Sequence, residues 1–462
     1  MTRPQSEAEY LARLTPASVA ATSRRSLLRG AVGAGAAVGG AALLSACGGS
    51  SSSSTSSAAG SASAGAATSD AGAAAAGGEV SFGSNASDPV PKKTIQALAD
   101  AFKAASGTSV KINTQDHGTF QENINNYLQG KPDDVFTWFA GYRMRFFAAK
   151  GLIGDVSDVW AKLQGYSDGF KAASTGDDGK QYFVPNSYYP WAVFYRPSVW
   201  KEKGYTVPKT MDELKALCQK MQKDGLIPIA FADKDGWPAM GTFDVLNMRV
   251  NGYQFHIDLM AHKVPWDDPK VKKVFSTWAE LLPYHQADPL GRTWQEAAQS
   301  LQNKKAGMYL LGLFVTEQMT ANLDDVDFFT FPEIDSTIGS DALDAPIDGF
   351  MMAAKPKDEA RAKALLAWLG TKEAGDVLGK VAPTTLIANS ASSTAAYTAL
   401  QKKSAELVGS AKNIAQFLDR DTRPDFASTV MIPSIKTFLG NPKDIDGLCK
   451  SIEGQAKTIF TA

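Results

Sequence analysis

The hydrophobic pattern from residue 79 onward alternates between short apolar runs and amphipathic stretches. Three apolar runs have the length of strands: 79–82, 110–112 and 134–138. After the first run, Ile95, Leu98 and Phe102 recur at helical spacing, and Gly107 is placed to end that helix. Strands that alternate with helices over short connections predict a mostly parallel α/β sheet.

The second half of the chain repeats this alternation after an extended, aromatic-rich stretch over 181–195. The pattern predicts helices over 211–223, 244–261, 271–283 and 294–303, and strands over 228–231, 308–311, 328–331 and 350–353. A region this long exceeds the ~250–300 residues that one hydrophobic core supports. We therefore expect two α/β units joined by extended crossing segments.

The ends of the first three strands point to candidate binding loops. In such sheets ligands bind beyond the carboxyl ends of the strands. The loops that follow these strands contain Asn85, Asp116, His117, Trp138 and Tyr142.

The N-terminal 46 residues have the pattern of an export signal. Residues 23–29 carry a twin-arginine pattern, and 30–46 are uncharged and end in Leu-Ser-Ala before Cys47. This ending resembles a bacterial lipobox, whose cysteine is lipidated and becomes the new N-terminus. An uncleaved membrane helix would need ~20 well-apolar residues, whereas this stretch is short and rich in glycine.

Residues 47–78 consist almost entirely of Gly, Ser, Ala and Thr. Such a composition offers too little apolar surface to offset the entropy of ordering, so it predicts a flexible tether. We expect a signal peptide over 1–46, a lipidated tether over 47–78, and a folded domain over 79–462 on the outer face of the membrane.

Charge and motifs exclude several classes of protein. Residues 79–462 hold 42 basic and 45 acidic residues, a net charge of −3, so a nucleic-acid partner is not expected. The sequence contains no GxxxxGK[ST], GxSxG, HExxH or paired CxxC motif. His256 and His262 do not share a helix face well, so we expect no metal site and no cofactor. Cys218 and Cys449 would form a disulfide or remain two buried thiols.

Several short motifs, in order along the chain, resemble one family. They are 102–107, 134–138, 151–153, 182–185, 193–197, 207–214, 225–230, 306–308 with 312–314, and 331–332. Together they resemble the maltose-binding type of extracellular solute-binding protein, which serves carbohydrate ABC importers. Two positions depart from the family pattern: Arg196 stands where Asn is usual, and Phe314 where many members have Trp.

The resemblance implies a two-lobed, Venus-flytrap fold that closes about a hinge on a sugar. Lobe 1 would comprise approximately 79–187 and 326–390, and lobe 2 approximately 188–325 and 391–462. The protein would capture a sugar or oligosaccharide and deliver it to the transmembrane permease. We expect a monomer without enzymatic activity.

A pyranose has apolar faces and a ring of hydroxyls, so its site needs aromatic platforms and fixed polar groups. The expected platforms are Trp138, Trp237 and Phe314; Tyr142 and Tyr188 would add edges and hydroxyls. Core packing is the alternative role for each of these rings. It is least expected for Trp237, which lies in a loop between a Gly and a Pro.

The polar candidates lie mostly at strand ends and turns. They are Asp116, Asp348, Gly349, Asn85, His117 and Arg420. Helix capping is the alternative role for Asp116, and turn formation is the alternative for Asp348.

Three other functions remain open at this stage. An exported carbohydrate-active enzyme would need two carboxylates about 5–9.5 Å apart. A binding protein for a polyol, glycerol phosphate, peptide or polyamine is the second, and Arg143 and Arg145 next to a candidate loop would suit a phosphate. A lipid-anchored adhesin or sensor with the same fold is the third.

Overall fold

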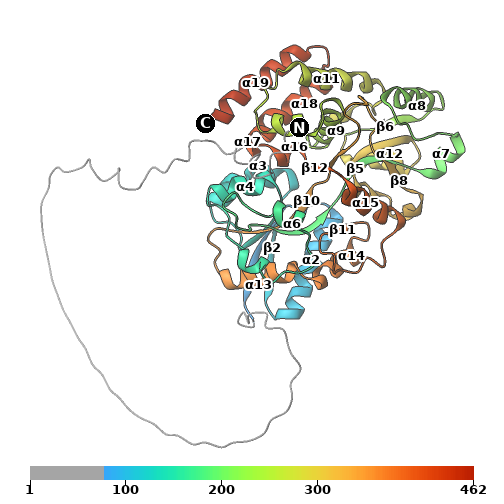
Figure 1. Ribbon diagram of the computed structural model, residues 1–462. Coiled ribbons are helices and arrows are strands. Elements are labelled where there is room, and N and C mark those ends of the chain that lie inside the picture. The colour runs from blue at the N-terminus through green and yellow to red at the C-terminus, as the bar shows by residue number, and fades with distance from the viewer. Residues whose placement is uncertain (1–76, 462) are drawn as a thin grey trace, which may run out of the picture. The chain divides into compact units, whose positions relative to one another are not determined.

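Two separate β-sheets organise residues 77–461, the part of the chain that the computed structural model describes (Figure 1). The first sheet has the order β11-β4-β10-β3-β1-β2, with strands β1 (Glu79–Ser84), β2 (Ser109–Thr114), β3 (Val135–Phe139), β4 (Val184–Tyr188), β10 (Ile347–Met352) and β11 (Leu386–Ile387). The second has the order β6-β7-β5-β8, with strands β5 (Trp191–Tyr195), β6 (Ile227–Ala230), β7 (Ala306–Gly312) and β8 (Asp327–Phe329). The expected signal peptide, Cys47 and most of the expected tether lie outside the described residues.

The chain crosses between the two sheets. The strand that it forms after a crossing, β5 or β10, runs antiparallel to its neighbours. β1 is parallel to β2 and β3, and β6 is parallel to β7, as the alternating pattern predicts. β5 instead runs antiparallel to β7, and β10 antiparallel to β3. Trp191 at the start of β5 pairs with Gly312 at the end of β7, and Asp348 on β10 pairs with Phe139 at the end of β3. A chain that enters a sheet at the edge where parallel strands end must run in the opposite direction, so both sheets are mixed rather than mostly parallel.

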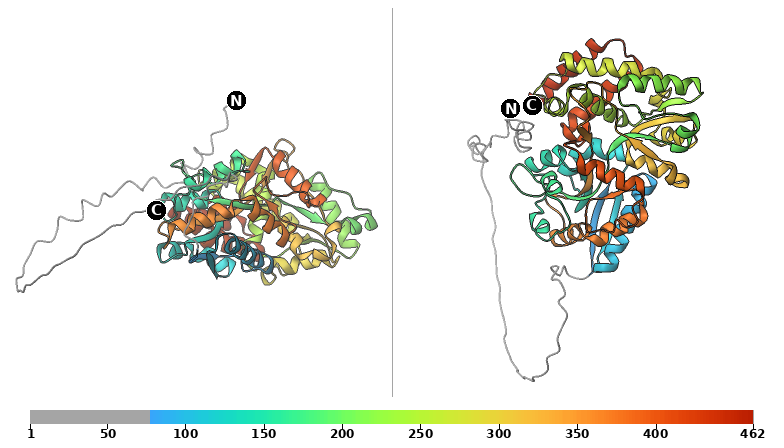
Figure 2. Two further views of the ribbon diagram at one scale, coloured as in Figure 1. Left: turned by 90° about the horizontal axis from the view of Figure 1, so that it is seen from below. Right: turned by 45° about the vertical axis from the view of Figure 1, so that its right-hand side comes forward.

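Helices of the first lobe pack on the first sheet. They are α2 (Pro89–Ser106), α3 (His117–Gln129), α4 (Tyr142–Ala149), α5 (Ser157–Trp160), α6 (Asp168–Ala173), α13 (Glu359–Leu369) and α14 (Lys372–Val381). In α2, Pro89 opens the first turn and Ile95, Leu98 and Phe102 form the buried face. Gly107 adopts a left-handed φ of 75° at the C-cap, which a glycine does without steric cost. α2 and α14, far apart in sequence, lie side by side (Figure 2).

The second lobe contains the remaining α-helices. They are α7 (Pro197–Lys203), α8 (Met211–Lys223), α9 (Pro238–Asn251), α10 (Tyr253–Met260), α11 (Pro269–Leu281), α12 (Trp294–Gln302), α15 (Ala399–Ser410), α16 (Leu418–Asp421), α17 (Pro424–Phe426), α18 (Ile432–Gly440) and α19 (Ile445–Thr461). A short two-stranded sheet pairs β9 (Ala342–Asp344) with β12 (Asn413–Ala415). The hydrophobic core around the second sheet is separate from the two clusters that flank the first.

The two-lobed α/β fold is confirmed. The structure differs from the sequence-based expectations in three local features. The helix expected over 244–261 is divided at Gly252, whose φ of 83° separates α9 from α10. β8 falls inside the segment 326–390 that we expected in lobe 1, yet it pairs with β5 of the second sheet. Cys218 and Cys449 are both buried free thiols, so the candidate disulfide is not formed. Each is packed inside the second-lobe core on its own helix, α8 or α19.

Among residues 77–461, none of the helices combines the length and the apolar character needed to span a bilayer.

Candidate functional site

A cavity of about 620 Å³ is lined by strand ends and loops of both lobes. It meets the first sheet where β1, β3 and β4 end, and the second lobe at the end of β7 and the start of α9 and α12. This is the edge at which α/β sheets commonly bind ligands. Its size falls in the usual range of small-molecule sites.

Aromatic rings from the second lobe form one wall of the cavity. Phe314 is at the centre of this wall, with ring centroids 5.8 Å from Trp237 and 5.1 Å from Trp294. Tyr189, in the crossing between β4 and β5, packs edge-on against Phe314 at 5.2 Å. We call Trp237, Trp294, Phe314 and Tyr189 the aromatic wall.

A glycine at the end of β7 allows the aromatic wall to assemble. A Cβ on Gly312 would lie 2.3 Å from the Phe314 ring and 2.9 Å from the Tyr189 ring. The chain then turns into a 3₁₀ segment, Leu313–Gln318, which holds Phe314 and Glu317 at the cavity. Only a residue without a side chain leaves both rings in place at this position.

A buried arginine organises the polar wall of the cavity, the name we give to Arg420, Asp348, His117 and Asn85. Arg420, on α16, donates from Nη1 to Asp348 over 2.9 Å and from Nη2 to the Tyr189 hydroxyl over 3.0 Å. Its guanidinium also lies 3.8 Å from the centroid of the Phe139 ring, a cation–π contact. Burial alone would lower the pKa of Arg420, but Tyr189 and Asp348 raise it overall, so the cation is permanent.

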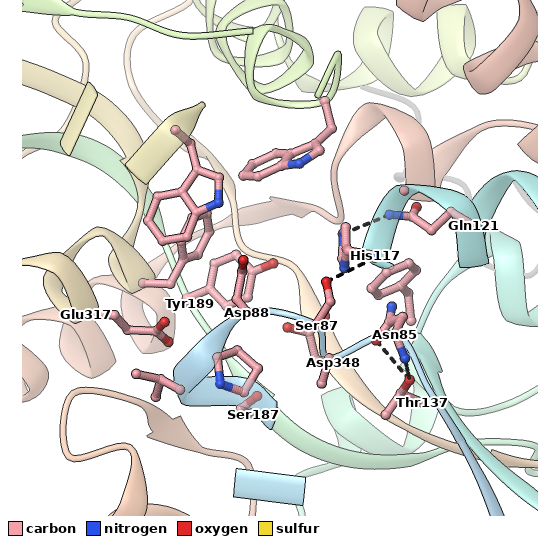
Figure 3. A pocket seen from close by; sticks show the side chains of 18 of the residues that line it. Asn85, Ser87, Asp88, His117, Gln121, Thr137, Ser187, Tyr189, Glu317 and Asp348 are labelled. Carbon is pink, nitrogen blue, oxygen red and sulfur yellow. Dashed lines mark hydrogen bonds between the residues drawn. The ribbon is translucent and has the colours of Figure 1, made fainter. Parts of the chain in front are cut away.

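Hydrogen bonds also hold the polar side chains that follow β1 and β2 (Figure 3). His117 and Gln121 contact each other at 2.8 Å, and the His117 backbone N–H donates to the Ser87 hydroxyl over 3.1 Å. Burial and the Arg420 charge lower the pKa of His117, so the imidazole is neutral at neutral pH. The Thr137 hydroxyl donates to Asn85 Oδ1 over 2.8 Å.

Two carboxyl groups occupy an acidic corner of the cavity (Figure 3). Asp88, in the first lobe, accepts a hydrogen bond from Gln295 Nε2 of the second lobe over 2.9 Å. Glu317 forms no hydrogen bond or ion pair among the described residues, and burial together with the Asp88 charge raises its pKa to about 8. Burial also raises the pKa of Asp88.

Most of the residues singled out from the sequence line this cavity. They are Asn85, Asp116, His117, Tyr188, Trp237, Phe314, Asp348, Gly349 and Arg420. Asp116 is at the same time the N-cap of α3, since its Oδ1 accepts from the Thr119 backbone N–H over 3.0 Å. A Cβ on Gly349 would lie 2.2 Å from the Val184 carbonyl oxygen, so glycine is needed where β10 passes β4.

Two expected aromatic residues have core positions instead. Trp138 borders the cavity but is only 1% exposed, and its ring packs near Phe120 and Phe147 at 6.1 and 5.8 Å. It therefore presents no free face, and its expected role as first stacking platform is wrong. Tyr142 is 2% exposed, packs in the same core and is not on the cavity wall. Helices cover both faces of β3, which is why its side chains and those of the following turn are buried.

The sequence reasoning missed Asp88, Tyr189, Trp294 and Glu317. Trp294 was visible as the first residue of a predicted helix, directly after the Thr293 N-cap. No local pattern marked Asp88 or Glu317, because their significance depends on the approach of the two lobes.

The two arginines next to a candidate loop, Arg143 and Arg145, do not form an anion site. Arg143 and Arg145 are 2% and 4% exposed; Arg143 donates to Gln121 Oε1 over 2.7 Å, and Arg145 donates to the Thr175 carbonyl over 2.9 Å. Within the described part of the chain, no group of three or more His, Cys, Asp or Glu residues is arranged to hold a metal ion.

Fold and cavity define a two-lobed solute receptor, and the family comparison agrees. Residues 86–376 match the model of the bacterial extracellular solute-binding proteins, and the chain belongs to this family. Its members are receptors that bind solutes outside the cytoplasm, not enzymes.

Among solved structures, the chain is similar to the bacterial solute receptor AcbH. The two are 48% identical with a TM-score of 0.80, over 83% of this chain and 99% of AcbH. AcbH is described as having an exclusive substrate preference for β-D-galactopyranose. A chitin oligosaccharide binding protein shares the fold at 19% identity, with a TM-score of 0.73, over 82% of this chain and 99% of that protein.

Sequence relatives include the alpha-glucosides-binding periplasmic protein AglE of Rhizobium meliloti, 26% identical over 60% of this chain and 65% of AglE. An uncharacterized ABC transporter extracellular-binding protein of Pyrococcus horikoshii is 27% identical over 55% of this chain and 58% of its own length. The chain thus spans about three fifths of the length of these relatives.

Proposed function

We propose that this protein captures a sugar and delivers it to the permease of an ABC importer. The observation that carries the proposal is that aromatic rings and fixed polar side chains line one and the same cavity. The rings suit the apolar C–H faces of a pyranose, while Asp348, Arg420, His117 and Asn85 offer acceptors and donors for its hydroxyls. Hydrogen bonds between charged groups and hydroxyls contribute about 1.5–3 kcal/mol each.

A hexose is the first ligand to test. AcbH, at 48% identity, is described as preferring β-D-galactopyranose, so D-galactose heads the series. The two arginines that would suit a phosphate, Arg143 and Arg145, are buried and engaged in other contacts.

Sugar binding would shift the two lobes toward their closed arrangement, which the permease would recognise. Hinge closure around a ligand is the characteristic motion of periplasmic binding proteins. A lipid on Cys47 and a flexible tether over 47–78 would hold a monomeric receptor at the outer face of the membrane, within reach of the permease. Residues 1–46 would be the export signal, with the twin-arginine or the general route as alternatives.

Titration calorimetry with D-galactose, D-glucose, maltose, lactose, glycerol 3-phosphate and putrescine tests the proposal. We expect saturable binding of at least one sugar and none of the phosphate or the amine. Binding of a non-sugar alone would contradict it. Release of reducing ends from an oligosaccharide during incubation would instead support an exported enzyme.

A further inference from the structure

A strained turn at Phe417 precedes the short helix that carries Arg420. Phe417 has φ 122° and ψ 143° and is the residue directly before α16. The other non-glycine residues with positive φ in the described part of the chain have φ values of 50°, 53° and 57°, close to the left-handed helical conformation, whereas Phe417 lies far from it. A bulky side chain adopts such a backbone conformation at a cost in free energy, so surrounding contacts must hold it there.

Contacts of the ring and of the backbone hold the turn. The Phe417 ring packs against Trp191 at a centroid distance of 5.1 Å, and the Phe417 carbonyl accepts from the Arg420 backbone N–H over 2.8 Å. The next residue, Leu418, donates its backbone N–H to Asp244 Oδ2 over 2.6 Å. The turn is therefore tied to α9 by a side chain that is distant in sequence.

The bond to Leu418 is the one hydrogen bond that Asp244 makes among the described residues. Asp244 is fully buried, does not line the cavity, and its Oδ1 has no hydrogen-bond partner in this part of the chain. His256 Nδ1 lies 3.9 Å from this oxygen, but burial lowers the pKa of His256 to about 3, so the imidazole is neutral and forms no ion pair. Burial of a carboxyl group is costly, and Leu418 is the partner that compensates for it.

The surroundings of Asp244 favour its neutral form. Burial and the charge of Asp344 raise the pKa of Asp244 well above its ordinary value. Asp344, at the end of β9, is only 1% exposed, and burial raises its pKa too. A neutral carboxyl group keeps a carbonyl oxygen that accepts from the Leu418 N–H, and the side-chain amide of an asparagine offers the same acceptor.

The position of Arg420 depends on how α16 is held. A helix of four residues is too short to be stable by itself, so the groups that bind its ends fix its orientation. Arg420 is the third residue of this helix, and its guanidinium reaches Asp348 and Tyr189 over 2.9 and 3.0 Å. The bond to Asp244 is made by the first residue of the same helix.

We propose that Asp244 is a positioning residue for the ligand site, which holds Arg420 in place through the turn at Phe417. The inference rests on the proposed sugar-binding function. Without the acceptor at Asp244, the turn relaxes and Arg420 is less well ordered in the free protein. The ligand then has to order the guanidinium on binding, which lowers affinity.

Two substitutions of Asp244 test the proposal. Asp244→Leu has a similar size but no acceptor, and we expect it to bind the sugar at least about threefold more weakly than the parent protein does. Asp244→Asn keeps the acceptor and should bind within about twofold of the parent. Titration calorimetry measures both affinities after circular dichroism has shown that the variants fold. Parent-like binding by Asp244→Leu would overturn the proposal, as would an equal loss in Asp244→Asn.

Glu453 provides the matched control. It is a buried carboxyl group of the second lobe that also accepts from a backbone N–H, that of Trp266, over 2.7 Å, but it lies outside the cavity. Glu453→Met should lower the melting temperature and leave sugar affinity within about twofold of the parent. If it weakens binding as much as Asp244→Leu does, the loss reflects general destabilisation and the proposal fails.

A double-mutant cycle shows whether Asp244 acts through Arg420. Asp244→Leu should change affinity by less than about twofold in an Arg420→Met background, because the side chain that it positions is already gone. Arg420→Lys takes the place of Arg420→Met if the latter binds no measurable sugar. The same loss from Asp244→Leu in both backgrounds would contradict the proposal.

The outcomes separate this proposal from the proposed function. If the parent protein binds no sugar, the proposed function fails. If the parent binds a sugar and Asp244→Leu binds it equally well, only the positioning role fails. Asp244→Ser, whose hydroxyl is one bond shorter than the carboxyl group, replaces Asp244→Leu if that variant does not fold.

Discussion

Arg420 donates from Nη1 to Asp348 Oδ1 over 2.9 Å, and this ion pair ties the C-terminal part of the chain to the first sheet at the cavity wall. The arginine side chain is 8% exposed and the aspartate side chain 34%. An ion pair in which one partner is buried fixes its geometry more firmly than an exposed pair does, because the buried charge has little water to replace its partner.

Arg420→Met should therefore lower both stability and sugar affinity. The partial exposure of Asp348 reduces the loss of unfolding free energy to about 1–3 kcal/mol. Sugar affinity should decrease at least tenfold, as a donor is lost and Asp348 is released. Urea unfolding and calorimetry measure the two effects. Lys412→Met is the control: it breaks the exposed Lys412–Asp341 pair and should change neither quantity appreciably. Equal effects of the two substitutions would contradict a special role for Arg420.

Trp237→Ala should weaken sugar binding about 10- to 100-fold with little change in melting temperature. The ring is partly buried, contacts Phe314 and His117 at the cavity, and would lose its stacking area on a pyranose. Calorimetry measures the affinity. Trp368→Ala, which removes a ring from α13 away from the cavity, should leave the affinity intact. Unchanged binding by the Trp237 variant would remove this residue from the site.

Gln295→Ala should shift the two lobes toward an open arrangement. The Gln295 side chain on α12 donates to Asp88, which lies at the start of α2 in the other lobe. Loss of a hydrogen bond between the lobes should lower the population of the closed state and thus the apparent affinity, about three- to tenfold. Small-angle scattering with and without sugar measures the contraction. Gln299→Ala is the matched control, because Gln299 contacts Gln318 within the same lobe. The same contraction midpoint for both variants would contradict the prediction.

Glu317→Gln should flatten the decline of stability with rising pH. The pKa of Glu317 is raised from 4.5 to about 8 in the folded protein, chiefly by burial. The proton that the folded state retains stabilises it fully below pH 4.5, and this contribution is lost as the pH rises through 8. The variant should consequently melt at a higher temperature than the parent at pH 8.5, with a smaller difference at pH 5. Glu406→Gln, at an exposed position on α15, should show no such pH dependence.

Cys47→Ser should move the protein from the membrane fraction to the soluble fraction. A thiol is required for diacylglyceryl attachment, and a serine cannot be lipidated in its place. Detergent phase partitioning after expression in a bacterium measures the change. Cys218→Ser, which alters a thiol buried in the second lobe, should remain with the membrane. Membrane association of the Cys47 variant would contradict the anchor.

Local spacing in the sequence determined the elements and their order. Ile95, Leu98 and Phe102 predicted α2 because helical periodicity depends only on neighbours three and four residues apart. The helix over Met211–Lys223 was predicted from its hydrophobic pattern with the observed bounds, and in the structure the Thr210 side chain caps its first turn by accepting from the Glu213 backbone N–H. The same local rules predicted that ligand-binding loops follow the strands.

Tertiary structure decided which side chains face the cavity. Trp138 lies near the end of β3, where an α/β sheet is expected to bind its ligand. It is nevertheless buried in the core, because helices cover both faces of β3. Asp88 and Gln295 are separated by 207 residues and meet only because the lobes approach each other. The Arg420–Asp348 pair likewise depends on α16 reaching the first sheet. Spacing along the chain shows which face of a helix or strand is apolar. Packing between distant segments decides which other element covers that face.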